Sequence, residues 1–164
     1  MIKSSNYINH QFNKSNNINI TLQLQQFEED YLFFCEPIKN NIMTEGNFIR
    51  ILYSSDLFTL NGIYLLLKIN NIHIEKYYNK FKYIFDTHSH TDIINKVKEI
   101  ECNILNKLNL GKIPQYKISE QLQNGHVKII ADKIERGNNL ILKMSGIWET
   151  DTEYGITYKF INVL

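Results

Sequence analysis

The amino-acid sequence predicts a mostly β fold with one long helix, in the form of an antiparallel barrel or sandwich. Segments rich in β-branched and aromatic residues occupy both ends of the chain, and several of them alternate apolar and polar residues. Between them, one segment has apolar residues at spacings of three and four, the period of an amphipathic helix. The 164 residues are 43% hydrophobic, enough to build one core rather than a disordered chain.

The chain is expected to contain one domain. Residues 1–17 are polar and rich in Asn and Ser, without periodicity, so we expect a flexible N-terminal arm. Residues 18–164 are expected to form a single β domain with a helical insertion at about 91–124. Eighteen Lys and Arg against 17 Asp and Glu give a net charge of +1, so affinity for nucleic acid or membrane must come from local patches.

The first half of the chain predicts strands. Residues 18–25 alternate apolar and polar side chains, and residues 31–35 and 47–53 are further strand candidates. Asn61-Gly62 lies between two apolar runs, and both residues tolerate the positive φ of a type I′ turn, which predicts a hairpin there. Residues 72–74 and 81–85 are also expected to be extended.

The helical insertion begins at Thr91. One stripe of an amphipathic helix is predicted to hold Ile93, Val97, Ile100, Ile104 and Leu108. Ser89 or Thr91 is expected to cap its first turn, and Gly111 to follow its end in the left-handed conformation. Pro114 suits the first turn of a shorter helix through Ile118 and Leu122, ended by Asn124-Gly125.

The last third returns to strands, at 126–131, 140–149 and 154–163, the final two joined by a hairpin across 150–153. A period of two places Trp148 on one face with Leu140, Leu142 and Met144. Tyr158 shares a face with Ile156 and Phe160, so both faces are predicted to be core. Strands, a helical insertion and more strands agree with an antiparallel OB-like barrel.

The cysteines and the apolar runs indicate an intracellular, non-secreted protein. Cys35 and Cys102 are far apart in the sequence, there is no CxxC motif, and the opening residues lack the apolar segment of a secretory signal. The longest apolar stretch, residues 63–69, is interrupted by Lys68 and falls short of the ~20 residues that cross a bilayer. We therefore expect no membrane association.

The strongest catalytic motif is Asp86-Thr87-His88-Ser89-His90-Thr91-Asp92. Alternate residues of an extended segment project to one side, so His88 and His90 could both reach a metal, with Asp92 as a third ligand. The string is similar to the opening of barrel metal-dependent hydrolases and to a metallo-β-lactamase motif. The first needs a barrel of about 250 residues, and the second a His where Ile93 stands. We favour helix capping and keep a metal-dependent hydrolase as an alternative.

No other enzyme signature is present. The sequence has no Gly-x-Ser-x-Gly elbow, no Walker loop and no GxGxxG, and neither cysteine lies in an activating context. We expect no enzymatic activity and no cofactor.

Two groups of aromatic and basic residues are candidates for binding single-stranded nucleic acid. Proteins that bind single strands combine stacking rings with a cationic groove. The first is in the tail, with Trp148, Tyr154, Tyr158 and Phe160 beside Lys143 and Lys159. The second interleaves Lys76, Lys80 and Lys82, with Lys96 and Lys98 beyond, with Tyr77, Tyr78, Phe81 and Tyr83. The alternative interpretation is that these rings are core and these lysines a solvated face.

The tail also carries a family resemblance. Leu142-Lys143-Met144-Ser145-Gly146-Ile147-Trp148-Glu149 followed by Tyr154-Gly155-Ile156-Thr157-Tyr158-Lys159-Phe160 resembles the closing hairpin of small proteins from nucleocytoplasmic large DNA viruses, which are similar to OB-fold single-stranded-DNA-binding proteins of viruses and phages. The segments Ile100 to Leu105 and Ile113 to Gly125 resemble that group's helical insertion, so the likeness covers roughly residues 96–163. The phage relatives usually end in an acidic tail, but this chain ends Asn162-Val163-Leu164.

The resemblance implies a non-enzymatic single-stranded-DNA-binding protein that supports viral DNA replication or recombination, with replication proteins or further copies of the chain as partners. If the protein is viral, the replication compartment of the host cell is its expected location. Trp148, Tyr154 and Tyr158 are then the stacking candidates, and phosphate contacts are expected from Lys143, Lys159, Lys128, Lys80 and Lys82. The alternative is a β-sandwich interaction or virion-structural protein that binds no nucleic acid.

Overall fold

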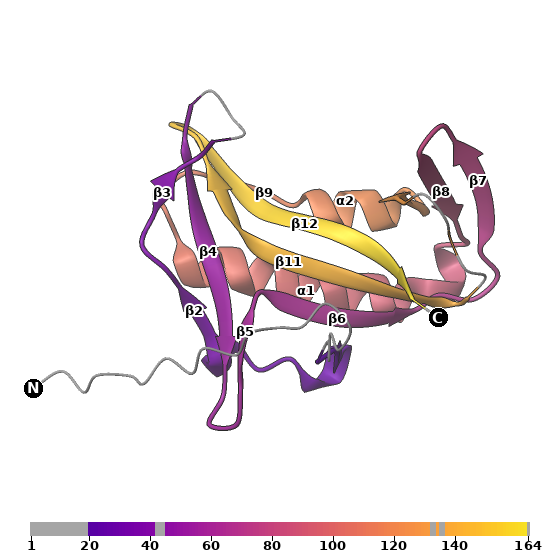
Figure 1. Ribbon diagram of the computed structural model, residues 1–164, viewed down its shortest axis with the longest axis horizontal. Helices are drawn as coiled ribbons and strands as arrows, with labels where there is room; N and C mark the ends of the chain where they lie inside the picture. Colours follow the sequence, from indigo (N-terminus) through magenta and orange to yellow (C-terminus); the bar gives the residue numbers. More distant parts are fainter. Residues whose placement is uncertain (1–19, 42–44, 132–133, 135–136, 164) are drawn as a thin grey trace, which may run out of the picture.

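The computed structural model describes residues 20–41, 45–131, 134 and 137–163 (Figure 1). The predicted arm, residues 1–17, lies outside them, as do residues 18 and 19 of the first predicted strand. The described residues form a mostly β protein with one long helix, which confirms the predicted class.

The described strands form two sheets. The larger contains β1 (Leu22–Gln23), β2 (Leu32–Phe34), β3 (Ile38–Lys39), β4 (Asn47–Ser54), β5 (Thr59–Asn61), β6 (Ile63–Lys68), β9 (Ile113–Gln115), β11 (Asn139–Glu149) and β12 (Glu153–Val163). The smaller contains β7 (His73–Tyr77), β8 (Lys80–Ile84) and β10 (His126–Ile130). The helices are α1 (Thr91–Leu108), α2 (Lys117–Gln123) and the 3-10 turns η1 (Leu24–Gln26), η2 (Glu29–Tyr31) and η3 (His88–His90).

The larger sheet is organised around the long antiparallel pair of β11 and β12. Along its other edge, β11 pairs with β6 from Asn139 to Met144 and with β4 from Gly146 to Glu149, so the sheet forks. The fork coincides with a bulge at Ser145, whose hydroxyl donates to the carbonyl of Thr157 at 3.2 Å. Two further pairs, β1 with β6 and β9 with β12, are parallel. The sheet is therefore mixed where the prediction was antiparallel, although most of its described pairings are antiparallel, and no closed barrel is found among the described strands.

The predicted hairpin at Asn61-Gly62 was also wrong. The hairpin lies earlier, between β4 and β5, where the amide of Ser55 donates to the carbonyl of Phe58 at 2.9 Å. Gly62, at φ +101°, carries the chain out of β5 into β6, which pairs with β11 instead. A Cβ at this position would lie 2.7 Å from the carbonyl oxygen of Met144, so the glycine serves a close backbone approach at the fork.

The first strand is shorter than the alternation predicts. Only Leu22 and Gln23 pair, and the chain then enters η1. The Gln26 side chain accepts a hydrogen bond from the Gln23 amide at 2.8 Å, which favours the turn over a continued strand.

The predicted long helix is confirmed as α1, but its ends differ from prediction. The left-handed residue directly at its end is Asn109, at φ +39°, and the predicted left-handed Gly111 follows two residues later at φ +69°. Pro114 was expected in the first turn of a helix but lies in the edge strand β9. This strand pairs only with β12, so the N–H that proline lacks is not needed to pair with a strand on the other side. The shorter helix α2 begins after it at Lys117, and Gly125 follows its end at φ +70°.

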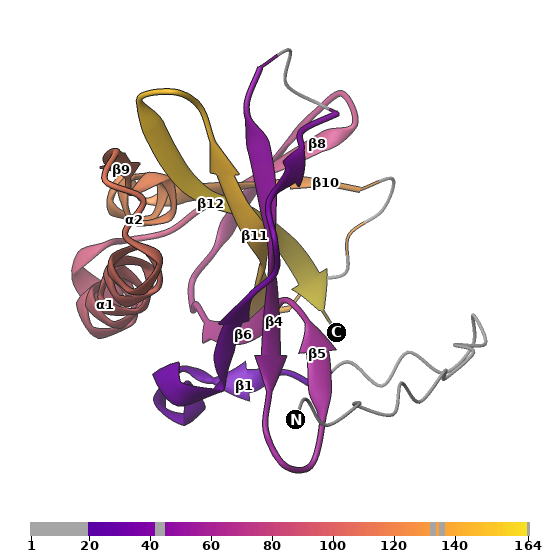
Figure 2. The same cartoon turned by 90° about the vertical axis from the view of Figure 1, so that its left-hand side faces the viewer.

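Both described α-helices lie on one side of the larger sheet (Figure 2). The sheet face turned toward them provides much of the core, including Ile49, Ile51, Leu65, Leu142 and Ile156. The smaller sheet stands at the end of the molecule opposite β2 and β3 (Figure 1). Neither α-helix is at once long and apolar enough to cross a membrane.

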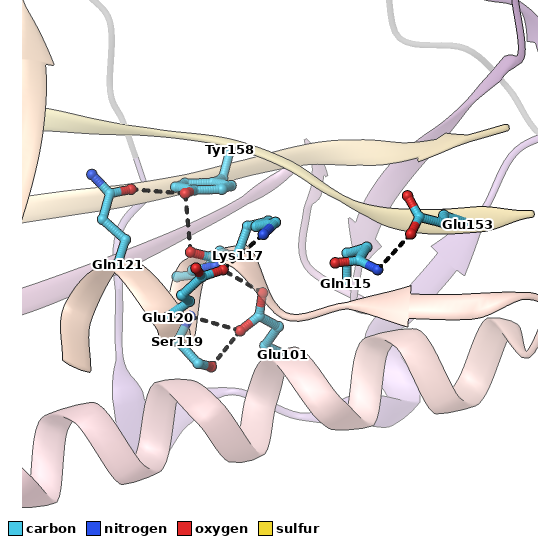
Figure 3. A network of polar contacts seen from close by, with 9 residues as sticks. Glu101, Gln115, Lys117, Ser119, Glu120, Gln121, Glu153 and Tyr158 are labelled. Carbon is cyan, nitrogen blue, oxygen red and sulfur yellow. Dashed lines mark hydrogen bonds and ion pairs between the residues drawn. The ribbon is translucent and has the colours of Figure 1, made fainter. Parts of the chain in front are cut away.

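One buried carboxylate joins the two helices. Glu101 of α1 is 1% exposed and accepts hydrogen bonds from the amides of Ile118 at 3.0 Å and Ser119 at 2.8 Å, and from the Ser119 hydroxyl (Figure 3). These are first-turn amides of α2, which its own N-cap residue, Tyr116, leaves without a side-chain acceptor. Glu101 therefore caps α2 from a neighbouring helix. Burial raises the pKa of its carboxyl group, against the lowering effect of the hydrogen bonds.

Candidate nucleic-acid interface

Three of the predicted phosphate-contacting lysines meet on one face of the smaller sheet. Lys82 of β8 lies directly opposite Lys128 of β10 in the antiparallel ladder. Lys80, two residues before Lys82, points to the same face because side chains alternate along a strand. Residues far apart in the sequence thus form one cluster, which we call the small-sheet basic face: Lys80, Lys82 and Lys128.

Exposed apolar side chains border this face. Lys80 lies opposite Ile130, which is 72% exposed, and opposite Tyr77, which is 68% exposed. Tyr78 follows in the β7–β8 turn at φ +54° and is 82% exposed, with its ring edge-to-face against that of Tyr77 at 4.8 Å. Three large exposed side chains, those of Ile130, Tyr77 and Tyr78, are thus grouped beside Lys80.

The three lysines are not neutralised by neighbouring carboxylates. None of them has an ion-pair partner within 4.0 Å among the described residues. Glu75 lies opposite Lys82, but its Oε1 atom lies 3.8 Å from Nε2 of His73 and makes no ion pair with Lys82. The face therefore has excess positive charge available to an anionic ligand.

The other rings of this segment belong to the core. Phe81 is 6% exposed and Tyr83 is fully buried, because alternation turns them to the opposite face from Lys80 and Lys82. Burial raises the pKa of Tyr83. Lys76, opposite Phe81, places its ammonium group 5.7 Å from that ring's centre. The lysine-and-ring pattern of the sequence thus separates into a basic face and a core face.

The other two predicted lysines lie on the larger sheet, on the face away from the helices. Lys143 of β11 is opposite Lys159 of β12 on one side and Tyr64 of β6 on the other. The Lys143 ammonium group lies 5.1 Å from the centre of the Tyr64 ring, a cation–π distance. Lys159 is exposed and Lys143 is half-buried. We call Trp148, Lys143, Lys159 and Tyr64 the outer face.

Trp148 belongs to the outer face, and its predicted position beside Leu140, Leu142 and Met144 was wrong. The extra residue at Ser145 inverts the alternation, so Ile147 and Glu149 continue the buried face instead. The half-buried indole lies over Gly155, where a Cβ would come within 2.8 Å of the ring.

The two predicted stacking tyrosines of β12 lie on the helix side of the sheet. Tyr154 is 3% exposed and donates to the carbonyl of Leu105 at 3.2 Å, so its ring is part of the core. Burial raises its pKa. Tyr158 is half-buried and donates to the Gln121 side-chain oxygen at 2.7 Å and toward the carbonyl of Lys117 at 3.2 Å (Figure 3). Burial, with the nearby carboxylates, raises the pKa of Tyr158 to about 12, so its phenol stays protonated.

The histidine motif has a local structural role. His90 is 6% exposed, its Nε2 accepts from the amide of Asn70 at 3.0 Å, and its Nδ1 donates to the carbonyl of Asp86 at 2.8 Å. With both ring nitrogens committed to backbone groups, His90 is not available to a metal. In the described part of the chain, no group of three or more His, Cys, Asp or Glu side chains is placed to hold one.

The predicted cap of α1 was also wrong, because the residue before the helix is His90 and it makes no side-chain cap. The carboxylate of Asp86 instead accepts from amides of the preceding 3-10 turn η3, those of Ser89 at 3.1 Å and His88 at 3.3 Å. These hydrogen bonds, with the Ser89 hydroxyl, lower the pKa of Asp86. Thr91 donates its hydroxyl to the carbonyl of His88 at 3.0 Å instead of accepting from the helix.

A second charged cluster supports the β11–β12 turn. Glu149 is 7% exposed and accepts from the Lys112 ammonium group at 2.6 Å and from the Asn47 side chain at 2.9 Å. These contacts lower the pKa of Glu149.

Sequence reasoning found the lysines but missed several neighbours. Tyr64 was interpreted only as part of an apolar run, and Ile130 only as the end of a strand. His126 was considered only as a further metal ligand for the His88 and His90 motif, although it lies two residues from Lys128 on β10. Alternation within one strand could have separated Tyr83 from Lys82, but the pairing of Lys82 with Lys128 depends on which strands are neighbours.

No protein-family model, no curated protein and no solved structure matches this chain. The resemblance of residues 96–163 to viral and phage single-stranded-DNA-binding proteins stays a prediction from the sequence.

Proposed function

We propose that the protein is a non-enzymatic single-stranded-DNA-binding protein, and that the small-sheet basic face is its principal contact with the strand. The observation that carries the proposal is the convergence of Lys80, Lys82 and Lys128, without carboxylate partners among the described residues, beside the exposed rings of Tyr77 and Tyr78. Cations that follow a phosphate backbone and rings that stack on bases are the two components of such sites.

The outer face offers a second contact of the same chemistry. Lys143 and Lys159 lie side by side there, with Tyr64 and Trp148 on the same surface. Tyr154 and Tyr158 are left out of direct base stacking in this proposal, because one is in the core and the other is half covered by α2.

The fold proposed with this function is an OB-like barrel with a helical insertion. The fork at β11 supports it, because a strand that changes partners along one edge lets a sheet curve through two directions. The wider role proposed is in viral DNA replication or recombination, with replication proteins or other copies of the chain as partners, in the replication compartment of the host cell.

A labelled oligothymidine of ~30 nucleotides, which avoids base pairing, tests the proposal by fluorescence anisotropy across a salt series. We expect binding that weakens linearly with the logarithm of salt, with a slope of about −0.7 per phosphate neutralised. The double variant Lys80→Gln/Lys128→Gln should then lower the magnitude of the slope by about 1.4, since two contacts are lost.

The matched control is Lys39→Gln/Lys107→Gln, which removes the same charge from exposed positions on β3 and α1. It should leave the slope unchanged. A third variant, Lys143→Gln/Lys159→Gln, tests the outer face. Loss of slope in that variant alone would move the principal contact to the larger sheet, and absence of binding at low salt would refute the function.

A protein-interaction or virion-structural role is the second candidate, favoured by one observation. Phe33 and Ile38 are 52% and 56% exposed on neighbouring edge strands paired with β4, on the side away from the core. Concentration-dependent oligomerisation without any affinity for oligothymidine would favour this role over DNA binding.

A further inference from the structure

A pocket of about 320 Å³ opens where α2, β10 and β12 meet. Lys128 of the small-sheet basic face lines it, together with His126 from the same strand, Gln121 and Asn124 from α2 and its end, and Tyr158 from the larger sheet. The volume falls within the usual range for small-molecule sites, roughly 300–1,000 Å³. Because Lys128 belongs both to the pocket and to the small-sheet basic face, the pocket adjoins the proposed DNA contact.

Several polar atoms of the pocket lack partners in the described part of the chain. Gln121 uses its oxygen to accept from the Tyr158 hydroxyl, which leaves its NH₂ group free (Figure 3). The Nδ1 atom of His126 faces the carbonyl of Asn124 at 3.2 Å, and since a carbonyl only accepts, Nδ1 donates and Nε2 remains free. The side-chain amide of Asn124 supplies a further donor and acceptor.

The charges of the pocket favour an anion. Lys117 and Glu120 form an ion pair at 2.8 Å on the rim, so their charges balance. Lys128 has no such partner among the described residues and leaves one positive charge in excess. A nucleotide has a base edge and a phosphate. The two side-chain amides, the imidazole nitrogen and the phenol are suited to the base edge, and the free ammonium group is suited to the phosphate.

We propose that this pocket binds one nucleotide of the single strand, its phosphate at Lys128 and its base edge at Gln121, Asn124 and His126. The inference rests on the proposed single-stranded-DNA function. It adds a subsite that recognises a nucleotide by hydrogen bonds, beside a face that attracts the backbone by charge.

The first test uses thymidine monophosphate as the probe and backbone amide chemical shifts of the full chain as the readout. We expect the shifts of residues 124–128 to change on titration, and to change less with thymidine or inorganic phosphate alone. His126→Ala should remove the response, whereas His73→Ala, on the same sheet face outside this pocket, should keep it. Unchanged shifts at residues 124–128 at millimolar nucleotide would overturn the inference.

The second test uses the ~30-mer oligothymidine and an isosteric charge change. Asn124→Asp preserves the size of the side chain but introduces a carboxylate into the pocket, so affinity should fall about fivefold to tenfold. Gln123→Glu adds the same charge one residue earlier, at an exposed position outside the pocket, and should change affinity by less than about twofold. Equal losses in the two variants would overturn the pocket.

The two proposals fail separately. Anisotropy of the unchanged protein tests the DNA function alone. A protein that binds the 30-mer with the predicted salt dependence but gives no nucleotide response at residues 124–128 refutes the pocket and leaves the function standing. The uncharged variant Gln121→Ala adds a further criterion, since it should weaken oligothymidine binding about threefold without changing the salt slope.

Discussion

Replacing Glu101 by alanine should destabilise the protein more than any other carboxylate change on α1. The substitution leaves the first-turn amides of Ile118 and Ser119 without their acceptor in a site where Glu101 itself is 1% exposed. An unmade hydrogen bond at a buried donor costs about 1–3 kcal/mol, so two amides give about 2–6 kcal/mol. For a domain of this size, a loss of about 3 kcal/mol lowers Tm by roughly 6–12 °C.

Thermal unfolding followed by circular dichroism measures this loss. Glu99→Ala is the matched control, because Glu99 is exposed on the same helix and forms only a surface pair with Lys96. Surface pairs of this kind contribute about 0.3–0.5 kcal/mol. If Glu101→Ala and Glu99→Ala lower Tm equally, Glu101 does not cap α2 and the reasoning is refuted.

The same carboxylate predicts a pH dependence. Its pKa is raised above the ordinary value of 4.5, so the folded protein binds this proton more tightly than the unfolded chain. The stabilisation from that proton is complete below pH 4.5 and is lost as pH rises through the raised pKa. Glu101→Gln, which does not titrate, should therefore gain stability relative to the unchanged protein as pH rises above 4.5. A constant difference across that range would contradict the direction of the shift.

Two further predictions concern the β11–β12 hairpin. Gly155→Ala would place a Cβ 2.8 Å from the indole of Trp148, so the ring must move, at a cost of about 1–3 kcal/mol. The emission maximum of this single tryptophan should shift, and an unchanged spectrum would show that the ring does not lie on Gly155. Lys112→Met removes the ammonium partner of Glu149 but keeps the hydrogen bond from Asn47, so the stability that the unchanged protein loses as pH falls below 4.5 should be smaller in the variant. Urea unfolding at pH 7 and pH 4 measures this difference, and an identical loss of stability in both proteins would argue against the ion pair.

Local sequence patterns predicted the helices and strands better than they predicted which strands pair with one another. The stripe from Ile93 to Leu108 identifies α1 because its period depends only on the helix itself. The hairpin predicted at Asn61-Gly62 was wrong because Gly62 is required by its close approach to the carbonyl of Met144. In the sequence, such a glycine cannot be distinguished from one that a turn requires.

The candidate site shows the same limit. Strand alternation gives the face of each side chain until a bulge interrupts it, and the bulge at Ser145 moved Trp148 to the side of Lys143. The pairing of Lys82 with Lys128 depends on β10 returning to β8 after the helical insertion, which no local period encodes. The lysines were identifiable from the sequence, but their convergence was not.

The fork of the larger sheet also determines when this chain can fold. The strands β4 and β6 come from residues 47–68, and the strand that holds both of them in place, β11, comes from residues 139–149. Contacts between such distant segments slow folding, because the chain closes a long loop before any ladder forms. During synthesis, β4 and β6 therefore each have one unpaired edge until the ribosome has released residue 149. A chain truncated before β11 would lack the strand with which both β4 and β6 pair, and the edges left unpaired would favour aggregation.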